Sequence, residues 1–144
     1  MKTPVPENIS FKIEGIELLE YSMKAPQTIL PDNLEYKFEF GIEHKINLEI
    51  KKIFVICSIS ILSEQFEGSF ANAKISCIYG FPEIETFFNK DDKKIEIPEN
   101  VSITLNSITL STCRGVMFTL LRGTFLHNVI LPIIDPKTFT NNGN

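Results

Sequence analysis

The stretch LEYKFEFGI, residues 34–42, decides the fold. Apolar or aromatic side chains occupy every second position, and charged residues or glycine stand between them. A period of two is typical of a β-strand with one buried face and one face in water. Because parallel sheets are covered on both sides, this pattern predicts an antiparallel sheet with one solvated face.

Three further strands are expected on either side of this stretch. Residues 48–63 carry the apolar run 53–57, which has no polar face and therefore indicates a central strand. Residues 64–69 include a glycine and predict a hairpin turn, after which alternation returns up to Gly80. Before the deciding stretch, residues 9–24 alternate with phase shifts at Gly15 and Leu19, which predicts one long, bent strand.

The second half of the chain predicts a helix over residues 99–121. Apolar or small side chains recur there at helical spacing for more than five turns: Val101, Leu105, Ile108, Thr112, Val116 and Leu120. Arg122 and Gly123 are typical of the end of a helix, where a cation stabilises the last turn and glycine forms the C-cap. Residues 82–89 read as one or two helical turns and 90–94 as a solvated loop. The expected fold is α+β, with a four-stranded antiparallel sheet and one long helix packed on it, in a single domain over 1–144 whose segments 1–8 and 140–144 are flexible.

Composition excludes several classes of function. The net charge of −4 and the scattered lysines and arginines argue against nucleic-acid binding. The longest apolar run is far too short to cross a membrane, and the N-terminus lacks the apolar core of a signal peptide. Three cysteines, an odd number without CxxC spacing, indicate free buried thiols in a reducing compartment, so we expect a cytoplasmic protein.

Residues that could carry chemistry are few. His44 and His127 lack neighbouring ligands, so no metal site is expected. Cys113 stands beside Arg114, which allows either an activated thiol or a small packed helix residue. No glycine-rich phosphate loop and no GxSxG motif occur, so we expect neither a cofactor nor an enzyme.

Four phenylalanines fall outside the periodic elements: Phe87, Phe88, Phe125 and Phe139. Aromatic rings at loops and helix ends either line a groove or an oligomer interface, or close the edges of the core. Both interpretations remain open at this point.

Several short motifs together resemble the SecB family of export chaperones. Residues 11–16 (FKIEGI), followed by 23–26 (MKAP), are similar to the opening of SecB; residues 122–125 (RGTF) follow the long helix as in that family, and 131–136 (LPIIDP) resemble its proline-bearing stretch. The resemblance implies a dimer-of-dimers assembly and ATP-independent binding of unfolded or partly folded polypeptides in apolar grooves. It also implies transfer of the client to the motor SecA.

The resemblance and the aromatic pattern lead to two sets of candidate residues. We expect client or partner contacts at Phe87, Phe88, Phe125, Leu126, Ile130, Leu131 and Phe139. A docking face for SecA is expected at Glu20, Lys24, Asn72 and Lys74, but Lys24 and Lys74 stand where the family has acids. Reversed charge at an electrostatic docking face lowers affinity.

Three hypotheses follow. The first is a homo-oligomeric holding chaperone, dimer or tetramer, that serves protein export. The second is a protein of SecB fold dedicated to one partner, such as an antitoxin. The third is a small α+β domain that binds an apolar ligand in a pocket lined by the loop aromatics. None involves nucleic acid or membrane insertion.

Overall fold

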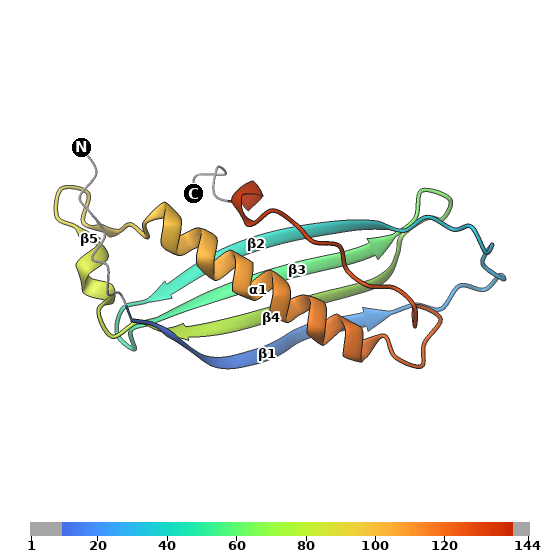
Figure 1. The fold of residues 1–144 in the computed structure, drawn as a ribbon, viewed down its shortest axis with the longest axis horizontal. Helices are drawn as coiled ribbons and strands as arrows, with labels where there is room; N and C mark the ends of the chain where they lie inside the picture. Colours follow the sequence, from blue (N-terminus) through green and yellow to red (C-terminus); the bar gives the residue numbers. More distant parts are fainter. Residues whose placement is uncertain (1–9, 140–144) are drawn as a thin grey trace.

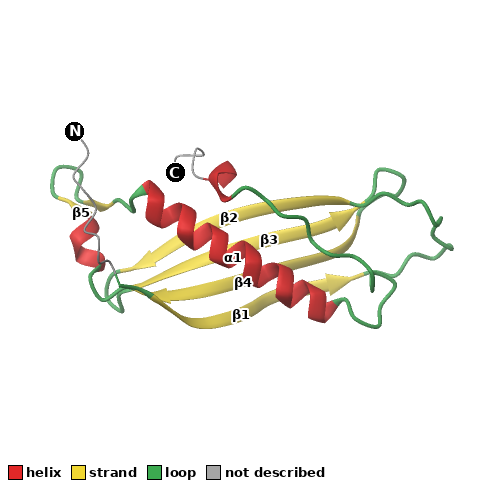
Figure 2. Ribbon diagram, in the orientation of Figure 1, coloured by secondary structure: helices red, strands yellow, loops and turns green. Residues whose placement is uncertain are grey.

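The computed structural model describes residues 10–139, so the flexibility expected for 1–8 and 140–144 concerns residues outside the described part. A four-stranded antiparallel sheet carries one long helix on one face (Figures 1 and 2). The elements are β1 (Lys12–Met23), β2 (Lys37–Asn47), β3 (Lys52–Leu62), β4 (Ser69–Gly80), η1 (Ile84–Phe87), β5 (Phe88–Asn89), β6 (Lys94–Ile95), α1 (Glu99–Leu120) and η2 (Pro136–Phe139). The expected fold class is therefore confirmed.

The strand order β1-β4-β3-β2 places β3 and β4 in the centre and leaves β1 and β2 at the edges. The prediction of a central strand from the apolar run is confirmed, because Val55 and Ile56 are both buried although they point to opposite faces. β2 pairs with β3 without interruption from Lys37 to Asn47. Its alternation therefore turns one apolar side toward the helix and one charged side to solvent.

β1 is one long strand with two irregularities, as its phase shifts predict. Its register against β4 slips between Ile13 and Gly15 and again between Leu18 and Glu20. Each bulge bends the strand and re-aims the side chains that follow. In Figure 1 this strand curves along one side of the sheet.

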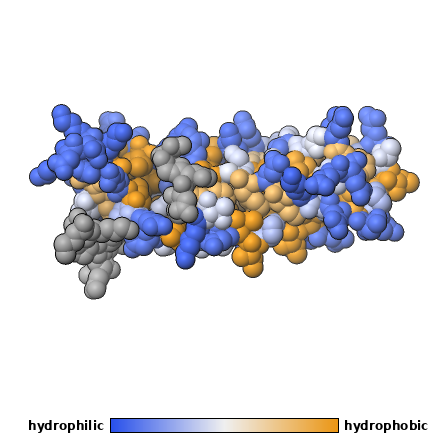
Figure 3. Space-filling model, turned by 90° about the horizontal axis from the view of Figure 1, so that it is seen from above, coloured by the Kyte–Doolittle hydropathy of each residue, from blue (hydrophilic) through white to orange (hydrophobic). Residues whose placement is uncertain are grey.

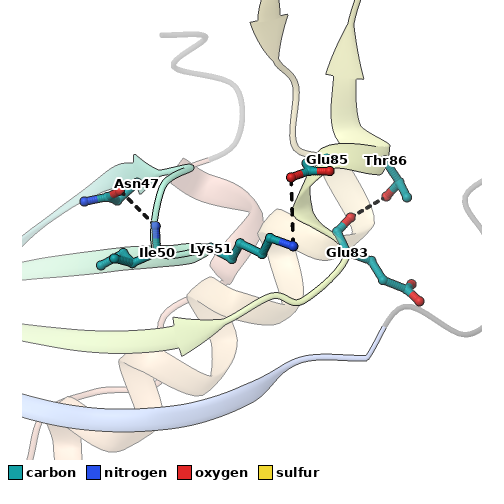
Figure 4. A network of polar contacts seen from close by, with 6 residues as sticks. All are labelled: Asn47, Ile50, Lys51, Glu83, Glu85 and Thr86. Atoms are coloured by element: carbon teal, nitrogen blue, oxygen red, sulfur yellow. Dashed lines mark hydrogen bonds and ion pairs between the residues drawn. The ribbon is translucent and has the colours of Figure 1, made fainter.

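The β2–β3 connection differs from the expected strand boundaries. Strand pairing in β3 begins at Lys52, because residues 48–51 form the hairpin turn, with Lys51 at a φ of 55°. The side chain of Asn47 accepts a hydrogen bond from the amide of Ile50, and Lys51 reaches Glu85 of η1 at 3.9 Å (Figure 4). The turn thus rests against the segment that follows β4.

The helix α1 is confirmed, but its buried side agrees with the predicted stripe only in the first turns, at Val101 and Leu105. Leu105, Cys113 and Met117 are fully buried against the sheet, whereas Ile108 is 36% exposed. The helix crosses the strands obliquely (Figure 1), so its line of contact drifts around the helix and departs from one straight stripe. From Ile108 onward the predicted stripe leaves the buried side and follows one flank of α1, with Thr112 only half-buried.

Two polar contacts fix the helix on the sheet. The hydroxyl of Tyr79 in β4 lies 2.8 Å from that of Thr109, and burial raises the pKa of Tyr79. On the other flank, Nε2 of His44 in β2 donates to the side-chain carbonyl of Asn106 at 2.7 Å, and Asn106 is almost fully buried. Asn106 therefore marks the flank of α1 that faces β2.

Candidate functional site

The chain reverses direction directly after α1, and this reversal forms one side of a hollow near the predicted client residues. Gly123 has a φ of 76°, a conformation that glycine adopts without strain. Arg122 donates to the carbonyl of Phe118 at 3.0 Å, and its guanidinium lies 3.9 Å from the centre of the Phe118 ring. The amide of Gly123 donates to Nδ1 of His127 at 2.9 Å, which closes the turn.

A groove lies between this turn and the start of β2. Its walls are Tyr36, Phe38, Phe125, Asn128, Val129 and Ile130, and its volume is about 390 Å³. The period-two pattern of the second strand turns Tyr36 and Phe38 toward the helix side, and the turn brings Phe125 opposite them. The ring of Phe125 packs edge-on against Phe70 at 5.7 Å, so this wall of the groove is anchored in the core.

The structure separates the seven predicted client residues into three groups. Phe125 and Ile130 line the groove. Leu126 and Leu131 are buried in the main core cluster, and Phe139 packs partly buried against it. Phe87 is buried in a second core cluster, and Phe88 is 44% exposed beside it. Phe87 ends η1 and Phe88 begins β5, at the end of the molecule away from the turn after α1 (Figure 1).

Sequence reasoning missed the β2 side of the groove. The alternation of residues 34–42 placed Tyr36 and Phe38 on the inner face, which is correct. What the pattern did not indicate is that their end of the strand stays only half-covered. Seen from above, the molecule shows hydrophobic surface in its middle between hydrophilic patches, and further hydrophobic surface near both ends (Figure 3).

A second apolar surface lies along β1 and was also missed. Four side chains on the helix side of β1 are exposed, namely Ile13 (44%), Ile16 (51%), Leu18 (46%) and Tyr21 (36%). Their neighbours across the pair are Tyr79, Cys77, Ile75 and Ala73 of β4, all buried. The inner face of the sheet is therefore closed over β4 and open over β1.

The predicted docking residues meet on the sheet face that carries no helix. Glu20, Asn72 and Lys74 line a hollow of about 350 Å³ together with serine side chains of β1 and β3. Glu20 and Lys74 approach to 4.0 Å, and Asn72 accepts a hydrogen bond from Ser60 at 2.8 Å. Lys24 follows the end of β1 and does not line this hollow. The hollow is polar and contains one acid and one base.

The thiols carry no sign of reactivity. Cys57, Cys77 and Cys113 are free and buried, as the odd number and spacing predict. A hydrogen bond with Cys57 and burial raise the pKa of Cys113, so its thiol stays protonated and the packed interpretation is correct. Within residues 10–139, His, Cys, Asp and Glu form no cluster of three or more that could hold a metal ion.

No helix in the described part of the chain is both long and apolar enough to cross a membrane. α1 has the necessary length, but serine, threonine and asparagine interrupt its apolar positions.

No protein-family model and no curated protein sequence matches the chain. Among solved structures, it is similar to the Mycobacterium tuberculosis SecB-like chaperone Rv1957, solved in complex with a ChAD peptide from the HigA1 antitoxin Rv1956. The TM-score is 0.62 at 18% sequence identity, and the match covers 86% of this chain and 90% of the other. The four-stranded antiparallel sheet and its long helix are therefore those of a divergent SecB-like fold.

Proposed function

We propose that this protein is an ATP-independent holding chaperone that binds extended, apolar segments of non-native polypeptides. The observation that carries the proposal is the open groove between Tyr36, Phe38 and Phe125, which lies beside a sheet edge. Among the described residues β2 pairs only with β3, so its outer edge offers free backbone donors and acceptors. The similarity to a chaperone solved with a peptide supports the same reading.

The chemistry of such binding needs no reacting group. An unfolded chain exposes apolar side chains and unpaired backbone, and an edge strand with an apolar groove satisfies both. Each large apolar side chain transferred from water into the groove contributes about 1.5–3 kcal/mol. Release then requires only competition or folding of the client, so we propose that no cofactor and no enzymatic step is involved.

The test is suppression of aggregation by two matched variants. Ile130 lines the groove and is 60% exposed, whereas Ile133 stands three residues later, is 87% exposed and does not line it. We expect the wild type to protect several unrelated unfolded proteins at stoichiometric ratio without ATP. Ile130→Asp should lose most of this protection because a carboxylate in an apolar contact is costly, and Ile133→Asp should retain it. Protection of no client by the wild type would refute the proposal.

A second candidate is a chaperone dedicated to one partner, such as an antitoxin. The structural neighbour was solved with an antitoxin peptide, which favours this candidate. The charge-balanced hollow at Glu20 and Lys74 favours it as well, since this hollow offers no excess of negative charge to an export motor. This candidate would be favoured if a pull-down retains one dominant protein and the chaperone does not protect general clients from aggregation. The third hypothesis, a closed pocket for a small apolar ligand, is less well supported because the groove is open to solvent.

We further propose that SecA docking is lost and that export is not the main role. Glu20 is paired with Lys74, so the face offers no excess of negative charge to a basic partner. Three buried free thiols support a cytoplasmic location, where thiols remain reduced. Failure of purified SecA to bind the protein at low salt is the expected result.

The open face of β1 supports a homo-oligomer. An exposed apolar edge strand is an aggregation hazard unless another chain or element covers it. The flank of α1 that carries Ile108 lies on the side away from Asn106, and we propose that it adds to the apolar surface of β1. We propose that a second copy covers this surface, in a single-domain protomer that forms a dimer or a tetramer.

A further inference from the structure

The chain after the turn crosses the sheet as an extended segment. Residues 129–139, here called the strap, run back from the end of α1 over β3 and β2 (Figure 1) and end in η2. None of the backbone groups of residues 130–134 forms a hydrogen bond with another described residue. This part of the strap is therefore held by its side chains, whereas Val129 and Thr138 form backbone hydrogen bonds near its two ends.

The side chains of the strap divide by burial. Val129 (8%) and Leu131 (4%) are buried in the main core cluster, and Ile134 packs against it. Ile130 and Ile133 point outward and are 60% and 87% exposed. An extended, apolar segment with an unpaired backbone has the same chemistry as the client that the groove is proposed to bind.

The strap also limits the groove. Val129 and Ile130 form one wall, opposite Tyr36 and Phe38. The apolar face of β2 continues beyond the groove through Phe40 to Ile42, where its side chains are half-buried against the cluster that contains Leu131. At about 390 Å³ the groove accepts a few side chains, and a longer client segment needs the floor that the strap partly covers.

From these observations we infer that the strap from Leu131 onward is an internal competitor, which occupies part of the client surface and is displaced when a client binds, while Val129 and Ile130 remain as a wall of the groove. This inference rests on the proposed function. Because residues 130–134 form no backbone hydrogen bonds with other described residues, exchange of this segment for a client breaks side-chain contacts and leaves the backbone pairing of the sheet intact. The apparent association constant for clients is then the intrinsic association constant multiplied by the fraction of molecules whose strap is open.

The sign of one mutational effect tests the inference. Leu131→Ala weakens the anchoring of the strap without touching the walls of the groove, so it should raise the open fraction and tighten binding of an unfolded client by about tenfold. If the strap is only a fixed part of the binding surface, Leu131→Ala will bind the client equally or more weakly, and the inference is overturned. Ile133→Ala is the matched control, with expected wild-type affinity because its side chain is exposed.

A spectroscopic readout keeps the test valid if Leu131→Ala unfolds. The protein contains no tryptophan, so Phe139→Trp places a single reporter on the partly buried end of the strap. A client without tryptophan should raise the accessibility of this residue to acrylamide at least twofold. Unchanged or lower accessibility on client binding overturns the inference. Failure of every variant, including wild type, to bind any client refutes the proposed function instead.

Discussion

The two edge strands of the sheet are both amphipathic, yet the molecule covers only one of them. The inner face of β2, including Phe38 and Phe40, is half-buried against the cluster formed with α1 and the strap. On β1, Ile16 and Leu18 pair with residues of β4 that are fully buried, but they themselves remain about half-exposed. The difference teaches that an alternating pattern reveals which face is apolar and leaves open whether that face is covered by the same chain or by another one.

The largest effect is expected where the chain covers its own core beside β2. Leu126 is fully buried between the turn and the main cluster. Leu126→Ala should lower the free energy of unfolding by about 2–5 kcal/mol, because it removes apolar contacts and leaves a cavity. Urea unfolding followed by circular dichroism measures this loss. Ile130→Ala, three-fifths exposed, should change stability by no more than about 0.5 kcal/mol. Equal effects of the two changes would mean that the turn is not part of the core.

The next effect concerns assembly through β1. Leu18→Lys puts a charge on the helix side of β1 and should weaken self-association by about 2 kcal/mol or more, a dissociation constant roughly 30-fold higher. Leu19 is a matched control, since it has similar exposure but lines a hollow on the opposite face with Phe54 and Ile56. Light scattering over a concentration series should show dissociation for Leu18→Lys and intact assembly for Leu19→Lys. A wild type that stays monomeric at high micromolar concentration would contradict the role assigned to β1.

A moderate effect is expected from the contact that ties β2 to the helix. His44→Ala leaves the buried carbonyl of Asn106 without its donor at 2.7 Å, and an unsatisfied buried acceptor costs about 1–3 kcal/mol. His44→Gln keeps a side-chain N–H donor and should recover part of the loss. Thermal and urea unfolding of both variants measure it. If both variants are as stable as the wild type, the contact does not hold the edge strand to the helix.

The smallest effect is expected on the outer face near β1. Lys74 and Glu20 are 4.0 Å apart and their side chains are 42% and 73% exposed. Solvent and salt screen such a pair, so Lys74→Ala should change the free energy of unfolding by less than about 0.5 kcal/mol. Unfolding curves at low and high salt should nearly coincide for the variant and the wild type. A loss above about 1 kcal/mol would indicate that β1 is held to β4 by charge and not by backbone pairing.

Much of the fold was predictable because periodicity reports burial directly. The alternation through Phe38 and Phe40, the two-sided apolar run in β3 and the phase slips at Gly15 and Leu19 each correspond to a structural feature. The turn at residues 48–51 was not predicted, since Leu48 and Ile50 continue the alternation although both are exposed. A local pattern carries no information about where the partner strand ends.

The candidate site was predictable only in part. Phe125 and Ile130 were chosen from their position after the helix, and both line the groove. Tyr36 and Phe38 were recognised as strand residues, but their role in the groove depends on where the turn after α1 comes to rest. That placement is set by the oblique crossing of the helix, which shifts the buried side from Ile108 toward Cys113 and Met117. Angles between elements arise from packing of whole surfaces, and no short stretch of sequence encodes them.

The pairing of charges on the sheet face that carries no helix has a consequence for kinetics. Lys52 reaches Glu14 at 3.1 Å, Lys74 lies near Glu20, and Lys45 lies near Glu43, so positive and negative groups alternate at short range. The field of an ion pair falls off faster with distance than that of a single charge, so these pairs contribute little to the steering of a distant charged chain. Encounters at these pairs should therefore respond only weakly to ionic strength. Selectivity among polypeptides that meet this face would then depend on their dissociation rates.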